Sequence, residues 1–526
     1  MCHSRTAPVR TVASCPLTFA DVPTAVTPPG GIPRPTGGVP VRISALASGR
    51  GEVHGPDVGV SGITASSDRV HGGDLFAAIP GRTAHGATFA PAAIALGAVA
   101  VLTDEAGCAH VPAGVPVLVV PDVRSVLGEV AADVYGRPST GLAMLGVTGT
   151  SGKTTTTFLM RAGLRAAGRV PGLIGTVATM IGDDEIKTGF TTPEAPDLQA
   201  LLAVMRERGV TDVAMEVSSH ALAMGRVGGV RYDVGGFTNL SEDHLDFHTD
   251  MEDYFAAKLR LLDELSARGV VVVDDEWGRR AAAGDPARIT VSTGGAPATW
   301  KASDISERPD GTTSFRVHGP DGLDLTAGCA IPGRYNVANV LLALAVLHEA
   351  GIPAPVSAPA VSAASVPGRM ERLDLGQGFL AVVDYSHKPA AVDGALRALR
   401  PLTPGRLVIV LGCGGDRDRG KRPHMGDIAA RGADSLIVTD DNPRSEDPAA
   451  IRQAMLDGAL AVPAAERGEV IEIGDRTEAI ARAVADARPG DTVLVAGKGH
   501  ETGQEIAGIV HPFDDRDVLR AALESR

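Results

Sequence analysis

The sequence predicts an α/β protein built from three domains, and three observations support this fold class. The chain has 526 residues, which is too long for a single hydrophobic core. Apolar runs of strand length alternate with helix-like stretches, an order typical of mostly parallel sheets. A stretch rich in proline and glycine, residues 351–368, indicates a linker at the border between the second and third domains.

The chain is expected to begin with a disordered tail over residues 1–44, because residues 1–40 hold eight prolines and little periodic pattern. A small α/β module is expected over residues 45–138. Its predicted elements are a helix at 90–96 and strands at 58–64, 74–79, 98–102 and 115–120.

The two larger domains are expected over residues 139–367 and 368–526. In the second domain we predict a helix at 336–349 and strands at 142–147, 212–217, 234–238 and 270–274. The third domain is predicted to be Rossmann-like, with strands at 379–384, 406–411, 435–439 and 492–496 separated by helices.

The composition excludes several classes of protein. The net charge of -14 argues against nucleic acid as a partner. The five cysteines are scattered without C-x-x-C pairing, which suits a reducing cytosol and predicts neither a disulfide framework nor a zinc site. No apolar stretch approaches the roughly 18 residues that a membrane span needs. We therefore expect a soluble, cytoplasmic, monomeric protein without membrane insertion.

A glycine-rich loop follows the strand predicted at 142–147 and opens into a helix. Such glycines let successive backbone N–H groups point at phosphate oxygens, while Lys153 adds charge and Thr154 a hydroxyl for Mg²⁺. Val147 stands where a usual Walker A loop has its first glycine, so this is a shorter variant. A simple glycine turn with a surface lysine would leave Thr154 and Thr155 without a role. The predicted ATP-phosphate site comprises Gly149, Thr150, Ser151, Gly152, Lys153, Thr154 and Thr155.

Two further segments carry metal-binding chemistry at predicted strand ends. Glu216 ends the apolar run that begins at Asp212, a position suited to holding Mg²⁺ beside a phosphate loop, although a helix-capping carboxylate is the alternative. His244 lies in N-L-S-E-D-H-L-D-F-H after the next strand. The density of histidine and aspartate in this loop indicates a metal or catalytic site rather than a solvated face.

Taken together, the motifs G-T-S-G-K-T-T, M-E-V-S-S-H, N-L-S-E-D-H-L-D-F-H and Y-F-A-A-K-L resemble those of the Mur ligase family, in the same order. The resemblance covers nearly everything after about residue 45. It implies an ATP-dependent enzyme that adds an amino acid to a UDP-muramoyl peptide. It also implies three domains: a UDP-binding domain, a central P-loop ATPase-like domain, and a C-terminal Rossmann-like domain that closes on them.

The resemblance assigns roles at the phosphate site. It implies that Lys153 and Thr154 hold the ATP phosphates and Mg²⁺, and that Glu216 and His244 ligate metal. Lys258 matches a lysine that is carbamylated in this family, which turns a cation into a carboxylate-like metal ligand. Without the resemblance, Lys258 would be taken for an ordinary solvated helix lysine.

The remaining matched positions concern the nucleotide and the sugar peptide. Asn339 resembles the adenine-side asparagine, and Arg369 and Asp384 match the nucleotide's other flank. Ser386 and Lys388 depart from the common D-Y-A-H-[TN]-P. The positions that match contacts to the UDP-sugar peptide are Ser67, Thr191, Thr192, Ser218 and Arg226. Ser67 has altered neighbours, and Met224 replaces a glutamine of some members.

The segment D-N-P-R, residues 441–444, resembles the signature of family members that add meso-diaminopimelate. Arg444 suits this substrate because a guanidinium binds a carboxylate through two parallel hydrogen bonds, and lysine lacks the extra carboxylate. Taken alone, the segment is a plausible type I turn. The matched diaminopimelate-binding positions are Arg417, Asp441, Asn442, Pro443, Arg444, Gly497 and Glu501.

The implied substrates are ATP, UDP-MurNAc-L-Ala-D-Glu and meso-diaminopimelate, joined through an acyl phosphate. One alternative is a ligase that adds L-lysine at the same step. A folylpolyglutamate synthase-like ligase is more distant, because D-N-P-R and the G-D-L-F module speak against it. A nucleotide-binding switch or inactive scaffold is the alternative from another class, and the intact Lys153, Glu216, His244 and Lys258 argue against it.

Overall fold

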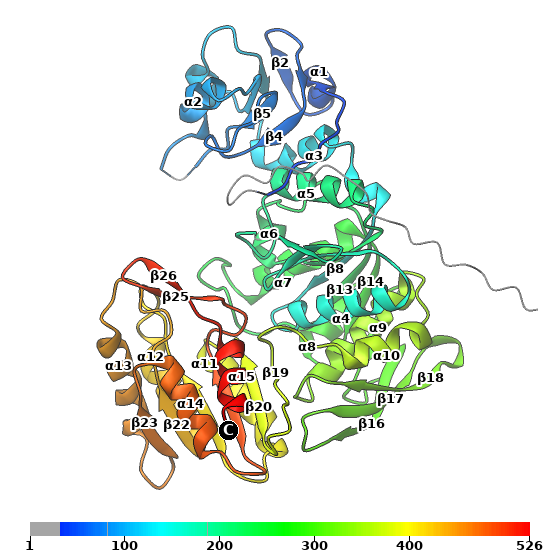
Figure 1. Ribbon diagram of the computed structural model, residues 1–526. Coiled ribbons are helices and arrows are strands. Elements are labelled where there is room, and N and C mark those ends of the chain that lie inside the picture. Colours follow the sequence, from blue (N-terminus) through cyan, green and yellow to red (C-terminus); the bar gives the residue numbers. More distant parts are fainter. Residues whose placement is uncertain (1–31, 82, 187) are drawn as a thin grey trace, which may run out of the picture.

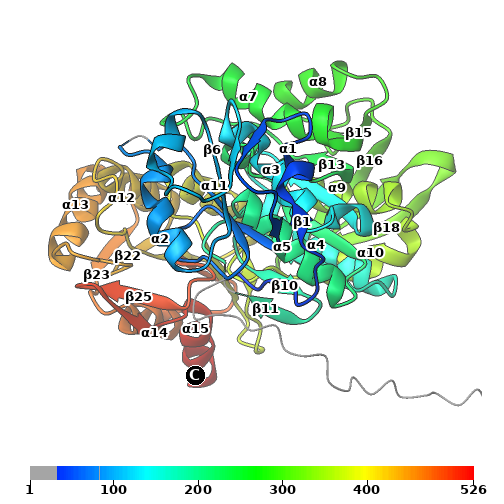
Figure 2. The same ribbon diagram turned by 90° about the horizontal axis from the view of Figure 1, so that it is seen from above.

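The computed structural model describes residues 32–81, 83–186 and 188–526. Three bodies, each built on its own sheet, follow one another along the chain (Figure 1). Seen from above, the first body lies over the central one, and the C-terminal body lies to one side (Figure 2). The predicted three-domain α/β fold is confirmed. Every helix in the described part of the chain is too short or too polar to cross a membrane.

The first body is a small module with a five-stranded sheet in the order β2-β7-β6-β5-β4 and a separate β1-β3 pair. Strands β4 to β7 run parallel, and α3 packs its apolar face beneath them. The elements are β1 (Val41–Arg42), α1 (Ile43–Ala47), β2 (Glu52–His54), β3 (Gly59–Val60), β4 (Gly62–Thr64), β5 (Asp74–Ala77), α2 (Ala90–Ala95), β6 (Ala100–Thr103), β7 (Val117–Val119) and α3 (Val123–Val134).

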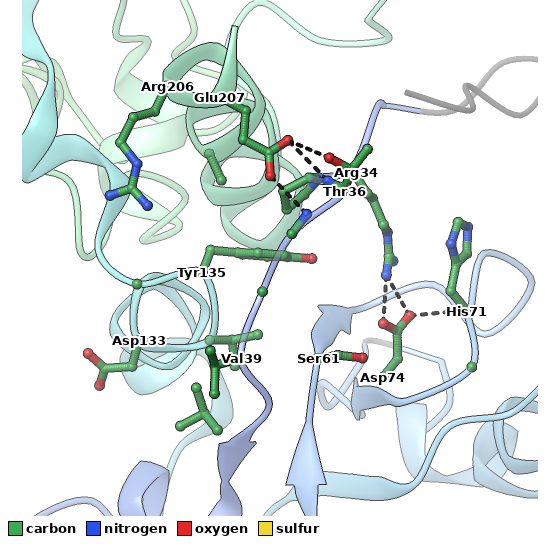
Figure 3. A pocket seen from close by; sticks show the side chains of 18 residues that line it. Arg34, Thr36, Val39, Ser61, His71, Asp74, Asp133, Tyr135, Arg206 and Glu207 are labelled. Carbon is green, nitrogen blue, oxygen red and sulfur yellow. Dashed lines mark hydrogen bonds and ion pairs between the residues drawn. The ribbon is translucent and has the colours of Figure 1, made fainter. Parts of the chain in front are cut away.

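Residues 32–44 are ordered, so the prediction of a disordered tail over 1–44 is wrong for this part; residues 1–31 lie outside the described residues. The Arg34 guanidinium donates to both carboxylate oxygens of Asp74, at 2.6 and 2.8 Å. The backbone N–H groups of Thr36 and Gly37 donate to Glu207 in the central domain (Figure 3). These ionic contacts order a proline-rich segment that has no helical or strand pattern of its own.

The central domain has an eleven-stranded sheet in the order β11-β10-β9-β12-β8-β13-β14-β15-β16-β17-β18. Its middle is parallel, as predicted, and both edges are antiparallel. The strands are β8 (Ala143–Thr148), β9 (Pro171–Ile174), β10 (Thr179–Ile181), β11 (Asp184–Ile186), β12 (Asp212–Glu216), β13 (Tyr232–Phe237), β14 (Ser266–Val272), β15 (Ile289–Ser292), β16 (Trp300–Glu307), β17 (Thr313–His318) and β18 (Asp324–Cys329).

Helices cover both faces of this sheet because its middle strands are apolar on both sides. Leu145 and Val147 of β8 face the core beneath α4 and α9, while Met144 faces the core beneath α5. The helices are α4 (Lys153–Ala166), α5 (Ala195–Glu207), α6 (Ser219–Ala223), α7 (Met251–Arg260), α8 (Glu276–Ala283), α9 (Asn336–Glu349) and α10 (Ala354–Ala363). Helix α9 has the bounds that the sequence predicts.

Helix α10 occupies most of the stretch that we predict to be a linker, and that prediction is wrong. Pro355 lies in the first turn of α10, where a missing N–H costs nothing, and Pro359 is tolerated inside it. The helix packs on α4 through small side chains: a Cβ on Gly163 would lie 3.1 Å from the Cβ of Ser357. The close approach of the two helices supplies the stability that local propensity lacks.

The C-terminal domain has a six-stranded sheet in the order β19-β20-β24-β21-β22-β23, parallel except at β19. It therefore has the predicted Rossmann-like character. Its elements are β19 (Glu371–Arg372), β20 (Leu380–Asp384), α11 (Pro389–Leu399), β21 (Leu407–Leu411), α12 (Lys421–Gly432), β22 (Ser435–Val438), α13 (Pro448–Ala461), β23 (Glu469–Glu472), α14 (Arg476–Asp486), β24 (Thr492–Ala496), β25 (Gly503–Ile506), β26 (Ile509–Pro512) and α15 (Asp515–Glu524).

Replacing Arg34 should destabilise the protein, because the side chain of Asp74 is only 2% exposed and would lose its cationic partner. We expect Arg34→Ala to lower the free energy of unfolding by about 3 kcal/mol, measured by denaturant titration. The matched control is Arg42→Ala, which removes an exposed guanidinium that donates to a backbone carbonyl. Equal stability of the two variants would contradict a structural role for the segment.

Candidate functional site

The pairing register of three parallel strands assembles the site. Glu216, the last residue of β12, pairs with Val147 of β8, and Phe237 of β13 pairs with Thr148. The chain segments that follow these strands therefore leave the sheet at the same edge. They are the phosphate loop, the turn after Glu216 and the loop containing His244, which is where ligands bind parallel α/β sheets.

The phosphate loop closely contacts its neighbours, and two of its glycines cannot be replaced without movement. Gly149 has φ +143°, and a Cβ there would lie 1.8 Å from Oγ1 of Thr238. Gly152 has φ +91°, and a Cβ there would lie 2.4 Å from Oδ1 of Asn339. The Ser151 N–H donates to Oδ1 of Asn239 at 3.0 Å. The loop is thus preshaped by β13 and α9.

Both predicted lysines converge on this loop. Lys153 donates to the carbonyls of Gly149 and Thr150 at 2.8 and 2.9 Å, and Lys258 donates to the same Gly149 carbonyl at 2.8 Å. Lys258 is 1% exposed, and burial together with the nearby Lys153 charge holds its pKa well below the usual range. Burial also lowers the pKa of Lys153.

Glu216 and His244 supply the remaining predicted metal ligands. Glu216 is buried and accepts hydrogen bonds from the backbone N–H and the hydroxyl of Thr176. His244 adopts φ +56°, a strained backbone that is common at functional sites, and burial lowers the pKa of its ring to about 4. The ring is therefore neutral at pH 7. Within the described ranges, no three His, Cys, Asp or Glu side chains converge tightly enough to enclose a metal ion.

A cavity of about 550 Å³ opens beside the phosphate loop between the central and C-terminal domains. Three predicted nucleotide positions, Asn339, Arg369 and Asp384, all line it. Arg369 lies over the ring of Tyr385 at 4.4 Å, and Asp384 accepts from the N–H groups of Met370 and Ser386. The cavity thus has the phosphate loop at one end and side chains of both domains along its walls.

Four of the predicted sugar-peptide positions gather at the turn after β12. The hydroxyl of Thr192 donates to the Glu216 carbonyl at 3.0 Å, and Ser218 caps α6. Thr191 lies 2.9 Å from the Thr176 hydroxyl, and Arg226 forms an ion pair with Glu194 at 2.9 Å. The fifth position, Ser67, is half-buried in the turn after β4 of the first module. It lines neither cavity between the central and C-terminal domains.

A second cavity, of about 1080 Å³, is lined mostly by loops of the C-terminal domain, including the segment that leads into α11. The guanidinium of Arg444 donates to the Gly415 carbonyl at 2.7 Å and lies 3.3 Å from the Glu505 carboxylate. Pro443 does not line the cavity. Its carbonyl oxygen lies close to Gly415, where an added Cβ would be 1.9 Å from it. The predicted amino-acid-binding residues that line this cavity are Arg417, Asp441, Asn442, Arg444, Gly497 and Glu501.

Two buried cations that the sequence does not single out hold the amino-acid loops. The fully buried ammonium of Lys498 donates to Asn442 and Glu501 at 3.0 and 3.3 Å. Arg476 binds both oxygens of Asp515 and also donates to the carbonyls of Ala496 and Asp440. Arg476 therefore ties the end of β24 to the end of β22. G-K-G-H-E offers a signal for Lys498, but nothing in the sequence indicates Arg476.

The fold and these cavities define a nucleotide-binding α/β enzyme whose C-terminal domain completes the site. Family models agree with this class along most of the chain: "Mur ligase family, catalytic domain" matches residues 59–135, "Mur ligase middle domain" 147–347, and "Mur ligase, glutamate ligase domain" 368–499. The chain belongs to the Mur ligase family.

Among its relatives, the UDP-N-acetylmuramoyl-L-alanyl-D-glutamate–2,6-diaminopimelate ligase of Streptomyces avermitilis is 56% identical over 474 residues, 89% of this chain and 93% of that protein. The enzyme of the same name from Corynebacterium glutamicum is 53% identical over 461 residues, 86% of this chain and 89% of that protein. A solved structure of a ligase with this name superposes with a TM-score of 0.68 at 31% identity, covering 93% of this chain and 99% of that one.

Replacing Gly152 should weaken nucleotide binding, because a Cβ would collide with Asn339 on a backbone that side chains rarely adopt. We expect Gly152→Ala to reduce the affinity for ADP by about tenfold or more, measured by calorimetry. The control is Gly168→Ala, which also has positive φ but faces open space. Matching losses in both variants would mean that backbone strain alone, and not the fit of the loop, is responsible.

Proposed function

We propose that this protein is an ATP-dependent ligase that adds meso-2,6-diaminopimelate to UDP-N-acetylmuramoyl-L-alanyl-D-glutamate in peptidoglycan precursor synthesis. The observation that carries the proposal is the second cavity, where Arg444, Arg417 and Glu501 face the same space as His244. An amino acid bound there lies next to the phosphate site. The relatives at 53 and 56% identity bear the name of this activity.

The proposed reaction has two steps. A carboxylate oxygen of the D-glutamate attacks the γ-phosphorus of ATP, and the bond from that phosphorus to ADP breaks. The amine of diaminopimelate then attacks the acyl carbon, the bond to phosphate breaks, and the amine loses its proton to solvent. The protein aligns the three substrates and supplies positive charge through Lys153, the main contributions to catalysis of phosphoryl transfer.

Magnesium fits the residues at the phosphate site. Mg²⁺ takes oxygen ligands and is usually held by one or two carboxylates together with substrate phosphates and water. Glu216 is a buried carboxylate at the end of β12, and Thr154 is the second residue of α4, which follows the neighbouring strand β8. Carbamylated Lys258 would add a further carboxylate-like oxygen. A bound Mg²⁺ would neutralise the charge of the phosphates, while Glu216, Thr154 and His244 would hold it in place.

The selectivity for diaminopimelate is proposed to come from Arg444. The guanidinium is held in place by the Gly415 carbonyl and Glu505 and keeps 23% of its side chain exposed toward the cavity. Diaminopimelate carries a second carboxylate that can pair with it. With lysine bound, the part of the guanidinium that Glu505 and Gly415 leave open to the cavity would meet no substrate carboxylate, which costs binding free energy.

A release assay for ADP with a panel of amino acids tests the function. With UDP-muramoyl dipeptide and ATP present, we expect kcat/KM for meso-diaminopimelate to exceed that for L-lysine by at least about 10²-fold. Arg444→Ala should raise KM for diaminopimelate by about tenfold or more and leave KM for ATP unchanged.

The control for Arg444 is Arg482→Ala, which removes an exposed guanidinium from α14 of the same domain. Preference for lysine by the wild-type protein would overturn the proposed substrate. A parallel loss of ATP and diaminopimelate binding in Arg444→Ala would contradict the role given to this residue.

Replacing Lys258 tests the proposed carbamate. We expect Lys258→Ala to lower kcat by about 10²-fold or more, because an anion that would hold metal is lost. Added formate or acetate should restore part of the rate. Lys301→Ala, an exposed lysine on β16, is the control. An active Lys258→Ala protein, or one that small carboxylates do not rescue, would remove the carbamate from the mechanism.

A further inference from the structure

One ion pair joins the central domain to the C-terminal domain within residues 32–81, 83–186 and 188–526. The Nζ atom of Lys388 lies 2.8 Å from Oδ1 of Asp243. Asp243 directly precedes His244, and Lys388 directly precedes α11. The contact therefore lies at the catalytic centre rather than at the periphery of the interface.

The chain around Lys388 forms the wall between the two cavities. His387, Lys388 and Pro389 line the amino-acid cavity, whereas Ala390 and Ala391, the next two residues, line the nucleotide cavity. The loop after β13 of the central domain, which faces Lys388, divides between the two cavities in the same way. Thr238 and Asn239 line the nucleotide cavity, while Asp243 and His244 line the amino-acid cavity. The Lys388–Asp243 pair thus lies where the two cavities meet.

The phosphoryl group must pass through this junction, because it leaves a nucleotide on one side and is finally displaced by an amine on the other. The charges around the junction agree with this placement. Lys388 brings a positive charge to the wall between the cavities, 2.8 Å from Asp243, the neighbour of His244. The side chain is 47% exposed, and among the described residues its ammonium pairs with Asp243 alone, so it can turn toward a bound anion.

We propose that Lys388 is a further catalytic residue, a cation that the C-terminal domain delivers to the phosphoryl group of the acyl phosphate and of the departing phosphate. This inference rests on the proposed function. In the absence of substrates, Asp243 holds the ammonium of Lys388 at the junction. When phosphate is bound, the ammonium leaves Asp243 and pairs with the phosphate, which carries more negative charge. Closure of the C-terminal domain and completion of the phosphate site are then one event.

Kinetics of Lys388→Met and Lys388→Arg test the proposal. We expect Lys388→Met to lower kcat by about tenfold to a hundredfold, because a charge that stabilises the leaving phosphate is lost. KM for diaminopimelate should stay unchanged, and Lys388→Arg should retain most of the activity. Arg397→Met removes an exposed cation from α11, the helix that follows Lys388, and should behave as the wild type. Wild-type kcat in Lys388→Met would overturn the proposal.

Binding of inorganic phosphate to the complex with ADP and Mg²⁺ gives a second readout, measured by calorimetry. It needs no amino acid, so it can succeed or fail whichever amino acid the enzyme adds. We expect Lys388→Met to weaken phosphate binding by about tenfold. Asp243→Asn should retain phosphate affinity, because Lys388 remains. Equal phosphate affinity in Lys388→Met and the wild type would overturn the proposed role. The ion pair between Lys388 and Asp243 would then serve only to join the two domains.

Discussion

The site depends on the register of three parallel strands, β12, β8 and β13. Because their carboxyl ends are level, the phosphate loop, Glu216 and the loop containing His244 leave the sheet together. A slip of one residue in this pairing would exchange the faces of the strand and separate these groups. The buried apolar side chains on both faces of β8 fix the register, so the hydrophobic core of the central domain also sets the geometry of the chemistry.

Two domains contribute residues to both cavities of the candidate site. The central domain supplies the phosphate loop and the buried lysines, while the C-terminal domain supplies most of the amino-acid cavity and part of the nucleotide cavity. The short segment between Asp384 and Ala391 contacts both spaces. Such an arrangement would make activity depend on the relative position of two bodies, which suits the proposed reaction, because its acyl phosphate must be kept from water.

The sequence predicts the parts of the fold that are set by local pattern. Strands such as β24 and the helix α9 have nearly the predicted bounds because they are continuously apolar and strongly buried. The sequence does not predict helix α10, because its prolines and the preceding Gly351 are typical of a linker. Packing on α4 determines its structure instead. The ordered segment at Arg34 was missed for a related reason, since its partners, Asp74 and Glu207, are 40 and 171 residues away.

The candidate site shows the same division. Motifs in the sequence indicate groups that line the two cavities, such as Asn339 and Arg444, but not the groups that hold them. Arg476 is fully buried and donates hydrogen bonds to the backbone carbonyls of Asp440 and Ala496. No residue spacing in the sequence indicates these contacts. Its presence has a consequence for protein engineering. One guanidinium holds the loops after β22 and β24 together. If only the D-N-P-R loop were replaced by that of another ligase, the new loop would lack the matching loop after β24 that positions it. Both loops should therefore be exchanged together.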